Sequence, residues 1–335
     1  MELSWVDHGI VINTLILLIS LIVLDTASHT AIANAVKTSE ITGIRKTTIG
    51  FTLIAFLTSL PELSVAVISA LTGAVGISIG NVLGSNIVNV CLIIGLGVLL
   101  ATLKRSKPLE STILSISKGD IESLYSGLFI ASLIPLSLIY IAYVSQVVGF
   151  ILLTIFVVYT YHLLKTKAPQ EEERENALWR RDQKAHRYVA LTFAGVVGVV
   201  ASSHFIVDSA SKIAEIVGVP QSLIGATIIA FGTSLPEFSL DVRAIVRGEP
   251  ALAFGDIVGS CFVNITLILG VTLLGSPFKV DMRVFSDLVI FSLISNLFLW
   301  YFLTIERMGR REGTILLFIY FLFLATTFGV IRMGG

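Results

Sequence analysis

Long apolar segments recur along almost the whole chain and are separated by short polar connections. We place ten of them, most approaching the ~20 apolar residues needed to cross a hydrocarbon core ~30 Å thick. Their expected ranges are 8–30, 43–71, 77–103, 121–143, 146–165, 189–215, 219–247, 251–276, 284–304 and 313–332. The pattern predicts an all-α membrane protein with ten transmembrane helices.

One stretch of the chain occurs twice, at an offset of 175 residues. The segment Thr58–Glu62 returns unchanged as Thr233–Glu237, and positions 29–95 share 28 identities in 67 with positions 204–270. A common preference for apolar residues would reproduce Leu and Val, but not a Pro-Glu pair. We expect three parts: a first repeat at 1–165 with its motif at 55–95, a linker at 166–187, and a second repeat at 188–335 with its motif at 230–270.

The two predicted halves enter the membrane from opposite sides, because each contains an odd number of spans. This arrangement predicts two inverted-topology five-helix repeats. Of the 23 Lys and Arg residues, 19 fall at the connections after spans 1, 3, 5, 7 and 9. By the positive-inside rule that side is cytoplasmic. We therefore expect a multi-pass plasma-membrane protein with a cytoplasmic linker at 166–187 and both termini extracellular.

The repeated segment carries a proline and a glutamate within an apolar run. Pro61 and Pro236 each lack a backbone donor, so they predict breaks in helices 2 and 7. Broken helices at the middle of a membrane are tolerated where the freed backbone groups meet protein, water or an ion. Together with Glu62 and Glu237, the breaks predict a duplicated ion site near the bilayer midplane.

The side chains around each break are rich in oxygen. They are Thr58, Ser59, Ser85 and Asn89 in the first half, and Thr233, Ser234, Ser260 and Asn264 in the second. Two carboxylates without a counterion in a low-dielectric site repel each other, and one of them takes up a proton; a divalent cation between them removes the repulsion. Oxygen ligands without imidazole or thiolate suit hard cations such as Ca²⁺, Na⁺ or Mg²⁺. The residues alone leave Mg²⁺ and Mn²⁺ open.

The composition agrees with a membrane protein: 55% of the residues are hydrophobic and 14% are charged. The net charge of zero gives no indication of a nucleic-acid partner. Cys91 and Cys261 lie in apolar stretches without metal-type spacing, so we expect small buried side chains. The chain begins without the basic region of a cleavable signal peptide, and we take its first apolar run as a true span.

At the repeated residues the chain resembles the cation/Ca²⁺ exchanger superfamily, in its Na⁺/Ca²⁺ exchanger branch with a minimal cytoplasmic loop. That family carries a G-T/S-S-x-P-E/D segment followed by G-x-x-x-G-S-x-x-x-N/D. The corresponding segments here are 57–62 with 80–89, and 232–237 with 255–264. The resemblance implies a secondary antiporter, not an enzyme, that exchanges Na⁺ for Ca²⁺ by alternating access. It implies no cofactor and no obligate protein partner, only the two ions and the lipid bilayer.

The resemblance also implies roles for individual residues. The implied Ca²⁺ ligands are Glu62, Glu237, Thr58 and Thr233. The implied Na⁺ ligands add Ser59, Ser85, Ser234, Ser260 and the carbonyls of Ala55 and Ala230, with Asn89 and Asn264 lining the centre. Spans 1 and 6 are expected to slide over the other eight helices.

Two departures from the family pattern change the expectation. Leu57 stands where the first repeat usually has glycine, which would tighten that helix break. Asn264 stands where K⁺-dependent relatives have aspartate, which argues against K⁺ co-transport.

Several alternatives remain open from the sequence. An antiporter of the same fold could use H⁺ or carry another divalent cation, such as Mg²⁺ or Mn²⁺. A cation channel is disfavoured, because channels usually gain their symmetry by oligomerising. An intramembrane hydrolase is disfavoured by the lack of a Ser-His, paired-Asp or HExxH arrangement.

For the other ionisable residues in apolar segments, the sequence predicts structural roles. Asp25, His29 and His204 are expected near span ends, in interfacial or helix-packing positions. Asp241 is interpreted as part of an ion pair at a cytoplasmic helix end, and Asp256 as a helix cap.

Overall fold

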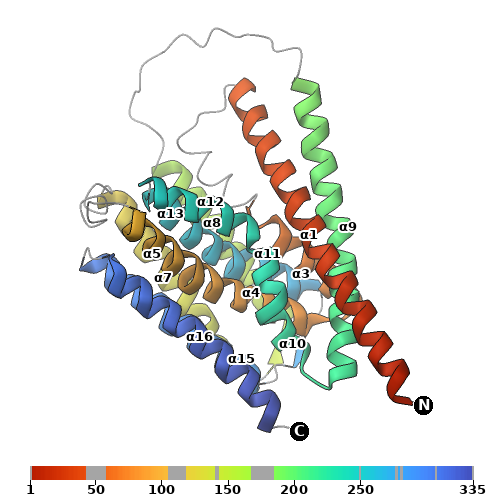
Figure 1. Cartoon of the computed structure of the whole chain (residues 1–335). Coiled ribbons are helices and arrows are strands. Elements are labelled where there is room, and N and C mark those ends of the chain that lie inside the picture. Colours follow the sequence, from red (N-terminus) through yellow and green to blue (C-terminus); the bar gives the residue numbers. More distant parts are fainter. Residues whose placement is uncertain are drawn as a thin grey trace.

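The computed structural model describes residues 2–42, 58–104, 118–139, 143–166, 185–248, 250–275, 278–279, 282–305 and 308–333. They form a bundle of helices, with two long helices lying along one side of it (Figure 1). Within these residues, the one β-pairing is a short antiparallel contact between β1 (Tyr143–Val144) and β2 (Phe278–Lys279). The expectation of an essentially all-α membrane protein is confirmed.

The described residues of the first half form six α-helices and one π-helical turn. They are α1 (Glu2–Thr42), α3 (Leu60–Thr72), α4 (Val75–Ile87), the π-turn η1 (Val88–Ile94), α5 (Gly95–Lys104), α7 (Lys118–Leu138) and α8 (Gln146–Thr166). The elements α4, η1 and α5 run on without a gap and match the predicted span 77–103. Of the predicted span 43–71, residues 43–57 lie outside the described part of the chain.

The described residues of the second half form the remaining described helices and two further π-turns. They are α9 (Ala185–Val217), α10 (Gln221–Ile224), η2 (Gly225–Ile229), α11 (Ala230–Thr233), α12 (Leu235–Arg247), α13 (Pro250–Val263), η3 (Asn264–Ile268), α14 (Leu269–Gly275), α15 (Met282–Thr304) and α16 (Arg310–Met333). The continuous run from α13 to α14 matches the predicted span 251–276. The predicted linker at 166–187 falls almost wholly outside the described residues.

The helix α1 is much longer than the predicted span 8–30. It contains 41 residues, whereas ~20 suffice to cross the hydrocarbon core. No glycine or proline occurs between Ile10 and Thr42, so nothing in the sequence stops the helix where the apolar segment ends. The apolar pattern located the lipid-facing part of α1 but not its end.

Six helices in the described part are long and apolar enough to cross a membrane. The pair formed by 221–233 and 235–247 makes a seventh if it is counted as one bent span. Shorter apolar helices lie at Leu60–Thr72, Leu124–Leu138 and Gln146–Tyr161. Large apolar side chains such as Phe150, Phe193 and Phe318 point outwards, as lipid-facing positions require.

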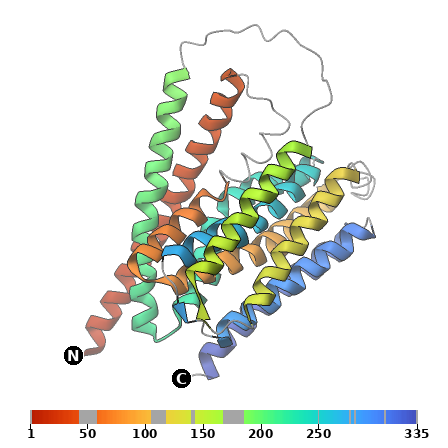
Figure 2. The ribbon, with the colours of Figure 1, turned by 180° about the vertical axis from the view of Figure 1, so that it is seen from behind.

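The two long helices α1 and α9 pack against each other over much of their length and lie side by side in both views (Figures 1 and 2). Small residues permit the contact: a side chain at Gly195 would meet the backbone of Ala31 at 2.7 Å. This close approach of small residues is typical of packing between membrane helices.

A second close contact joins the two halves inside the bundle. On α4, Gly80 and Gly84 face the backbone of α10 and η2 so closely that a Cβ at either position would overlap Ser222 or Ala226. From the other side, Gly225 of η2 faces Ile77 of α4 in the same way. The glycines thus bring α4 and the residues just before α11 close together.

Candidate cation site

The two repeated glutamates lie at the beginnings of two matching helices. Glu62 is in the first turn of α3, and Glu237 is in the first turn of α12. Pro61 and Pro236 also occupy these first turns, where a missing backbone donor costs nothing. Both glutamates are buried, with 1% and 0% of their surface exposed.

The residue before each of these helices adopts the same backbone conformation. Ser59 has φ −80° and ψ 6°, and Ser234 has φ −85° and ψ 11°. This sparsely populated region of φ/ψ space is frequent at functional sites. At Ser234 the chain bends by 53° between the helical segments 221–233 and 235–247. The predicted break in helix 7 is therefore present.

One hydroxyl from each half donates to Glu62. The Ser234 hydroxyl donates to Glu62 Oε1 at 3.2 Å, and the Ser85 hydroxyl donates to the same oxygen at 3.4 Å. In the matching position, the Ser59 hydroxyl donates to the Ser260 hydroxyl at 3.2 Å. The four predicted serines therefore meet at one place, where the two repeats contact each other.

The two repeated threonines reach across the same contact. The Thr233 hydroxyl donates to Asn81 Oδ1 at 3.0 Å, and the Thr58 hydroxyl donates to Asp256 Oδ1 at 3.5 Å. Asn81 and Asp256 occupy equivalent positions in the two repeats. The structure thus repeats the contact geometry, while the sequence changes an amide to a carboxyl group.

Many buried oxygens at this place have no hydrogen-bond partner. They are Glu62 Oε2, both carboxylate oxygens of Glu237, Asn89 Oδ1 and Asn264 Oδ1. An unsatisfied buried acceptor costs about 1–3 kcal/mol, so such a group needs an explanation. A bound cation would use these oxygens as ligands.

The two asparagines mark π-helical turns that the sequence did not predict. Asn89 lies in η1, and Asn264 is the first residue of η3. Single π-turns inside α-helices occur frequently at functional sites, because the extra residue redirects neighbouring side chains. Only the occurrence of both asparagines in the repeat could have indicated these turns. In addition, Asn264 Nδ2 donates to Asn86 Oδ1 at 2.9 Å.

The carbonyl oxygens predicted from the resemblance are only partly described. Ala55 lies outside the described residues. Ala230 begins α11, and its carbonyl accepts the backbone N–H of Ser234 at 3.1 Å. The same carbonyl also accepts the Thr233 hydroxyl at 3.4 Å, so an ion at Ala230 would have to take the place of this second, longer bond.

The roles that the sequence predicts for Asp241 and Asp256 are wrong. Asp256 is not a helix cap: α13 begins at Pro250, so Asp256 lies inside the helix with 1% of its surface exposed. Asp241 is not part of an ion pair at a helix end: it is fully buried, and both its oxygens lack a hydrogen-bond partner. Both side chains face the interior beside Glu237, a placement that only the packing of α12 on α13 could reveal.

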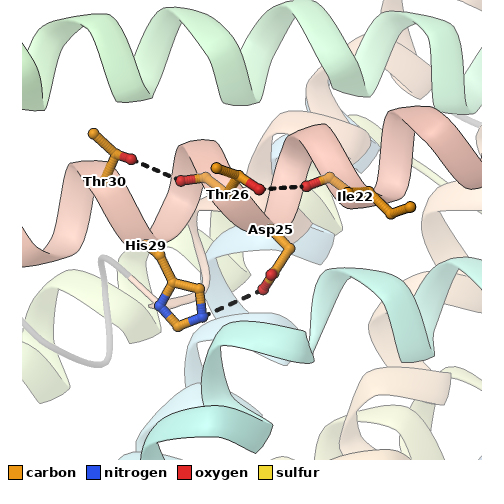
Figure 3. A network of polar contacts seen from close by, with 5 residues as sticks. All are labelled: Ile22, Asp25, Thr26, His29 and Thr30. Carbon is orange, nitrogen blue, oxygen red and sulfur yellow. Dashed lines mark hydrogen bonds and ion pairs between the residues drawn. The ribbon is translucent and has the colours of Figure 1, made fainter.

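The remaining predicted side chains, on α1 and α9, make contacts of their own. Asp25 and His29 contact each other at 3.4 Å on the partly exposed surface of α1, well inside the helix and not at its end (Figure 3). Thr26 and Thr30 donate to backbone carbonyls one turn earlier on the same helix (Figure 3). His204 is exposed on α9 and packs edge-on against Phe205.

The arrangement favours a hard cation held mainly by neutral oxygens. Within the described residues, no group of three His, Cys, Asp or Glu side chains is placed to hold one metal ion together. An ion here would therefore combine two carboxylates at most with hydroxyl, amide and carbonyl oxygens. Cys91 and Cys261 are fully buried and unpaired by disulfides, as the apolar context predicts.

Comparison with known proteins gives consistent relatives. An uncharacterized membrane protein of Methanocaldococcus jannaschii is 32% identical over 292 residues, which is 85% of this chain and 87% of the relative. The sodium/calcium exchanger MaX1 of Methanosarcina acetivorans is 29% identical over 95% of this chain and 99% of its own length.

A solved structure is similar over nearly the same extent. The sodium-calcium exchanger NCX_Mj, soaked with 10 mM Na⁺ and zero Ca²⁺, superposes with a TM-score of 0.64 at 26% identity. The similarity covers 94% of this chain and 99% of NCX_Mj. The family model described as sodium/calcium exchanger protein matches residues 12–165 and 187–329. This chain therefore belongs to the sodium/calcium exchanger protein family.

Proposed function

We propose that this protein exchanges Na⁺ for Ca²⁺ across the membrane as a secondary antiporter. The observation that carries the proposal is the pair Glu62 and Glu237: both are buried, they begin matching helices, and three of their four carboxylate oxygens have no hydrogen-bond partner. Ionisable groups buried in a membrane mark ion pathways by default. Membership of the exchanger family supports the choice of ions.

Ca²⁺ would lie between the two glutamates. Its ligands would be the carboxylates of Glu62 and Glu237 with the hydroxyls of Thr58 and Thr233, whose side chains are all buried. Two negative charges balance the charge of one Ca²⁺, which reduces the cost of removing the ion from water.

Na⁺ would occupy positions beside the Ca²⁺ site. Its proposed ligands are Ser59, Ser85, Ser234, Ser260, the carbonyls of Ala55 and Ala230, and at the centre Asn89 and Asn264. The hydroxyl of Ser234 already contacts Glu62, so Na⁺ and Ca²⁺ would share the same carboxylates. Shared ligands make the two ions exclude each other, which exchange requires.

The proposed topology has ten spans in two inverted five-helix repeats, with both termini extracellular and 166–187 cytoplasmic. In this proposal, residues 1–165 form the first repeat and residues 188–335 the second. The views support an even number of crossings, because N and C lie at the same end of the bundle (Figures 1 and 2). At the other end of the bundle, away from N and C, the C-terminal end of α1 and the N-terminal end of α9 project beyond the other helices (Figure 1).

Alternating access would arise from movement of α1 and α9 over the remaining helices. Leu21 of α1 lies against Gly232, two residues before the bend at Ser234. A separate apolar cluster, including Leu17, Leu24, Ile206 and Val207, lies where these two helices meet the bundle. A movement of α1 would therefore change the contact between Leu21 and Gly232, next to the helix break at Ser234.

The proposal is tested by ⁴⁵Ca²⁺ uptake into proteoliposomes under an imposed Na⁺ gradient, an H⁺ gradient or no gradient. We expect uptake to depend on Na⁺ and not on K⁺. Uptake that followed the pH gradient and ignored Na⁺ would contradict the proposal and favour H⁺ coupling. If Mg²⁺ or Mn²⁺ were taken up as well as Ca²⁺, the assignment of Ca²⁺ as the transported ion would fail. Flux without a counter-ion would indicate a channel.

The variants Glu62→Gln and Glu237→Gln test the site itself. Each removes one charge from the ligands of Ca²⁺, and we expect uptake to fall roughly 100-fold, corresponding to about 2.7 kcal/mol. Glutamine keeps an oxygen that can accept the Ser234 hydroxyl, so the Glu62 variant should still fold. The matched control is Asp208→Asn, because Asp208 is an exposed carboxylate paired with Lys212 on α9.

A further inference from the structure

The second half of the chain contains two buried carboxylates that the first half lacks. Asp241 on α12 corresponds to Ala66, and Asp256 on α13 corresponds to Asn81. Asp241 has 0% and Asp256 has 1% of its surface exposed. The otherwise matched contact between the repeats therefore carries extra negative charge on one side only.

The two carboxylates lie next to each other and close to Glu237. Asp241 follows Glu237 by four residues on α12, which places it one turn further along the same face. Its carboxyl group interacts with that of Asp256 on the neighbouring helix α13. The hydroxyl of Thr58 donates to Asp256 Oδ1 at 3.5 Å and completes the group.

Three of the four oxygens in this pair accept no hydrogen bond from any other residue, although the two carboxyl groups contact each other. They are both oxygens of Asp241 and Oδ2 of Asp256, and all are buried. Two facing carboxylates in a low-dielectric environment repel each other and lose their hydration, so a proton or a cation must lie between them. No basic side chain of the described residues donates to either group. In the first half the need does not arise, because Ala66 and Asn81 are neutral.

We propose that Asp241, Asp256 and the hydroxyl of Thr58 form a further cation site, specific for a monovalent hard cation and occupied by Na⁺. The group offers too few oxygens for Ca²⁺, which takes about 6–8. Carboxylate and hydroxyl oxygens suit Na⁺, which is the monovalent ion of the proposed exchange. The inference rests on the proposed function only for this choice of ion.

The site would couple to the one between Glu62 and Glu237. Thr58 belongs to both, since its hydroxyl contacts Asp256 and is a proposed ligand of Ca²⁺. The charge of Asp256 also acts on Glu237. A Na⁺ ion held by Asp241 and Asp256 would therefore repel Ca²⁺ from the neighbouring site and favour its release.

The test is equilibrium binding of ²²Na⁺ to the purified full chain in detergent, without Ca²⁺. The double variant Asp241→Ala with Asp256→Asn gives the second half the residues of the first. We expect it to bind one Na⁺ fewer per chain than the unaltered protein. The control, Asp208→Asn with Glu215→Gln, removes two exposed carboxylates from α9 and should leave the number unchanged.

Folding is checked by size-exclusion chromatography and thermal unfolding. If the double variant fails to fold, Asp256→Asn alone serves, because it keeps the oxygen that accepts the Thr58 hydroxyl. We expect this variant to weaken Na⁺ binding at the site at least about tenfold, corresponding to about 1.4 kcal/mol. An unchanged number and affinity of bound Na⁺ would overturn the inference. Loss of a bound Ca²⁺ in place of a Na⁺ would overturn the choice of a monovalent ion.

A second variant separates this inference from the proposed function. Glu62→Gln with Glu237→Gln should abolish ⁴⁵Ca²⁺ binding and retain the Na⁺ bound by Asp241 and Asp256. If Ca²⁺ binding persists, the proposed function fails. If Ca²⁺ binding is lost and the Asp241 and Asp256 variants bind Na⁺ normally, only the further site fails.

Discussion

Individual residues of the repeat do not have identical surroundings, although their backbones match. Glu62 receives two hydroxyl hydrogen bonds on one oxygen, whereas neither oxygen of Glu237 has a partner. A partner that fixes a carboxylate in place also lowers the cost of its burial. The two glutamates are therefore equivalent in sequence and unequal in structure.

The serines provide a test that distinguishes the ions. Ser234→Ala removes the donor to Glu62 and a proposed Na⁺ ligand, but no proposed Ca²⁺ ligand. We expect the Na⁺ concentration for half-maximal exchange to rise roughly five-fold, corresponding to about 1 kcal/mol, with that for Ca²⁺ nearly unchanged. Na⁺-dependent ⁴⁵Ca²⁺ uptake over a range of both ions measures this.

The control for this prediction is Ser209→Ala. Ser209 is buried on α9, and its hydroxyl has no hydrogen-bond partner. Its removal should leave both concentrations unchanged. An equal rise for Na⁺ and Ca²⁺ in Ser234→Ala would show that Ser234 positions Glu62 for both ions and does not discriminate between them.

At the scale of the elements, glycines decide how closely the helices approach. A methyl group at Gly84 would overlap the backbone of Ala226, so α4 and η2 can pack as they do only with glycine at this position. The contact sets the distance between the two halves beside Ser85, the residue after Gly84. Helix packing and ligand geometry are thus fixed by the same residues.

Gly84→Ala should destabilise the protein. We expect a loss of about 1–3 kcal/mol in the free energy of unfolding, as for overpacking elsewhere, and a lower midpoint in a thermal unfolding experiment in detergent. The matched control is Gly329→Ala on α16, where an added Cβ meets nothing within 4 Å. This control should be neutral or slightly stabilising, because alanine favours a helix over glycine. Equal midpoints for both variants would contradict the role of close packing at Gly84.

At the scale of the whole molecule, the distribution of basic residues predicts the orientation in the membrane. Most Lys and Arg residues fall on one side of the predicted topology, and this side is cytoplasmic by the positive-inside rule. The shared position of the two termini in the bundle agrees with an even number of crossings (Figure 1).

Labelling of whole cells with an impermeant thiol reagent tests the orientation. A cysteine introduced at Thr72, the exposed last residue of α3, should react. Cysteines introduced at Arg311 or at position 175 should react only after the cells are lysed. The natural Cys91 and Cys261 are fully buried and can remain. The reverse pattern of labelling would overturn the orientation.

The sequence by itself determined the features that depend on local pattern. Apolar segments predicted most of the helices, and the repeated Pro-Glu segment identified the two glutamates and the break at Ser234. These features follow from the cost of exposing polar groups to lipid and from the missing donor of proline, which act within a few residues.

Only the tertiary structure decided what depends on contacts between distant residues. The π-turns at Asn89 and Asn264 and the burial of Asp241 beside Asp256 had no signal in any local window. The sequence placed Asp241 near arginines and Asp256 near a helix start, and both local arguments were wrong. Which charges share a buried space is fixed by the packing of one helix on another, because only that packing removes water from both groups at once.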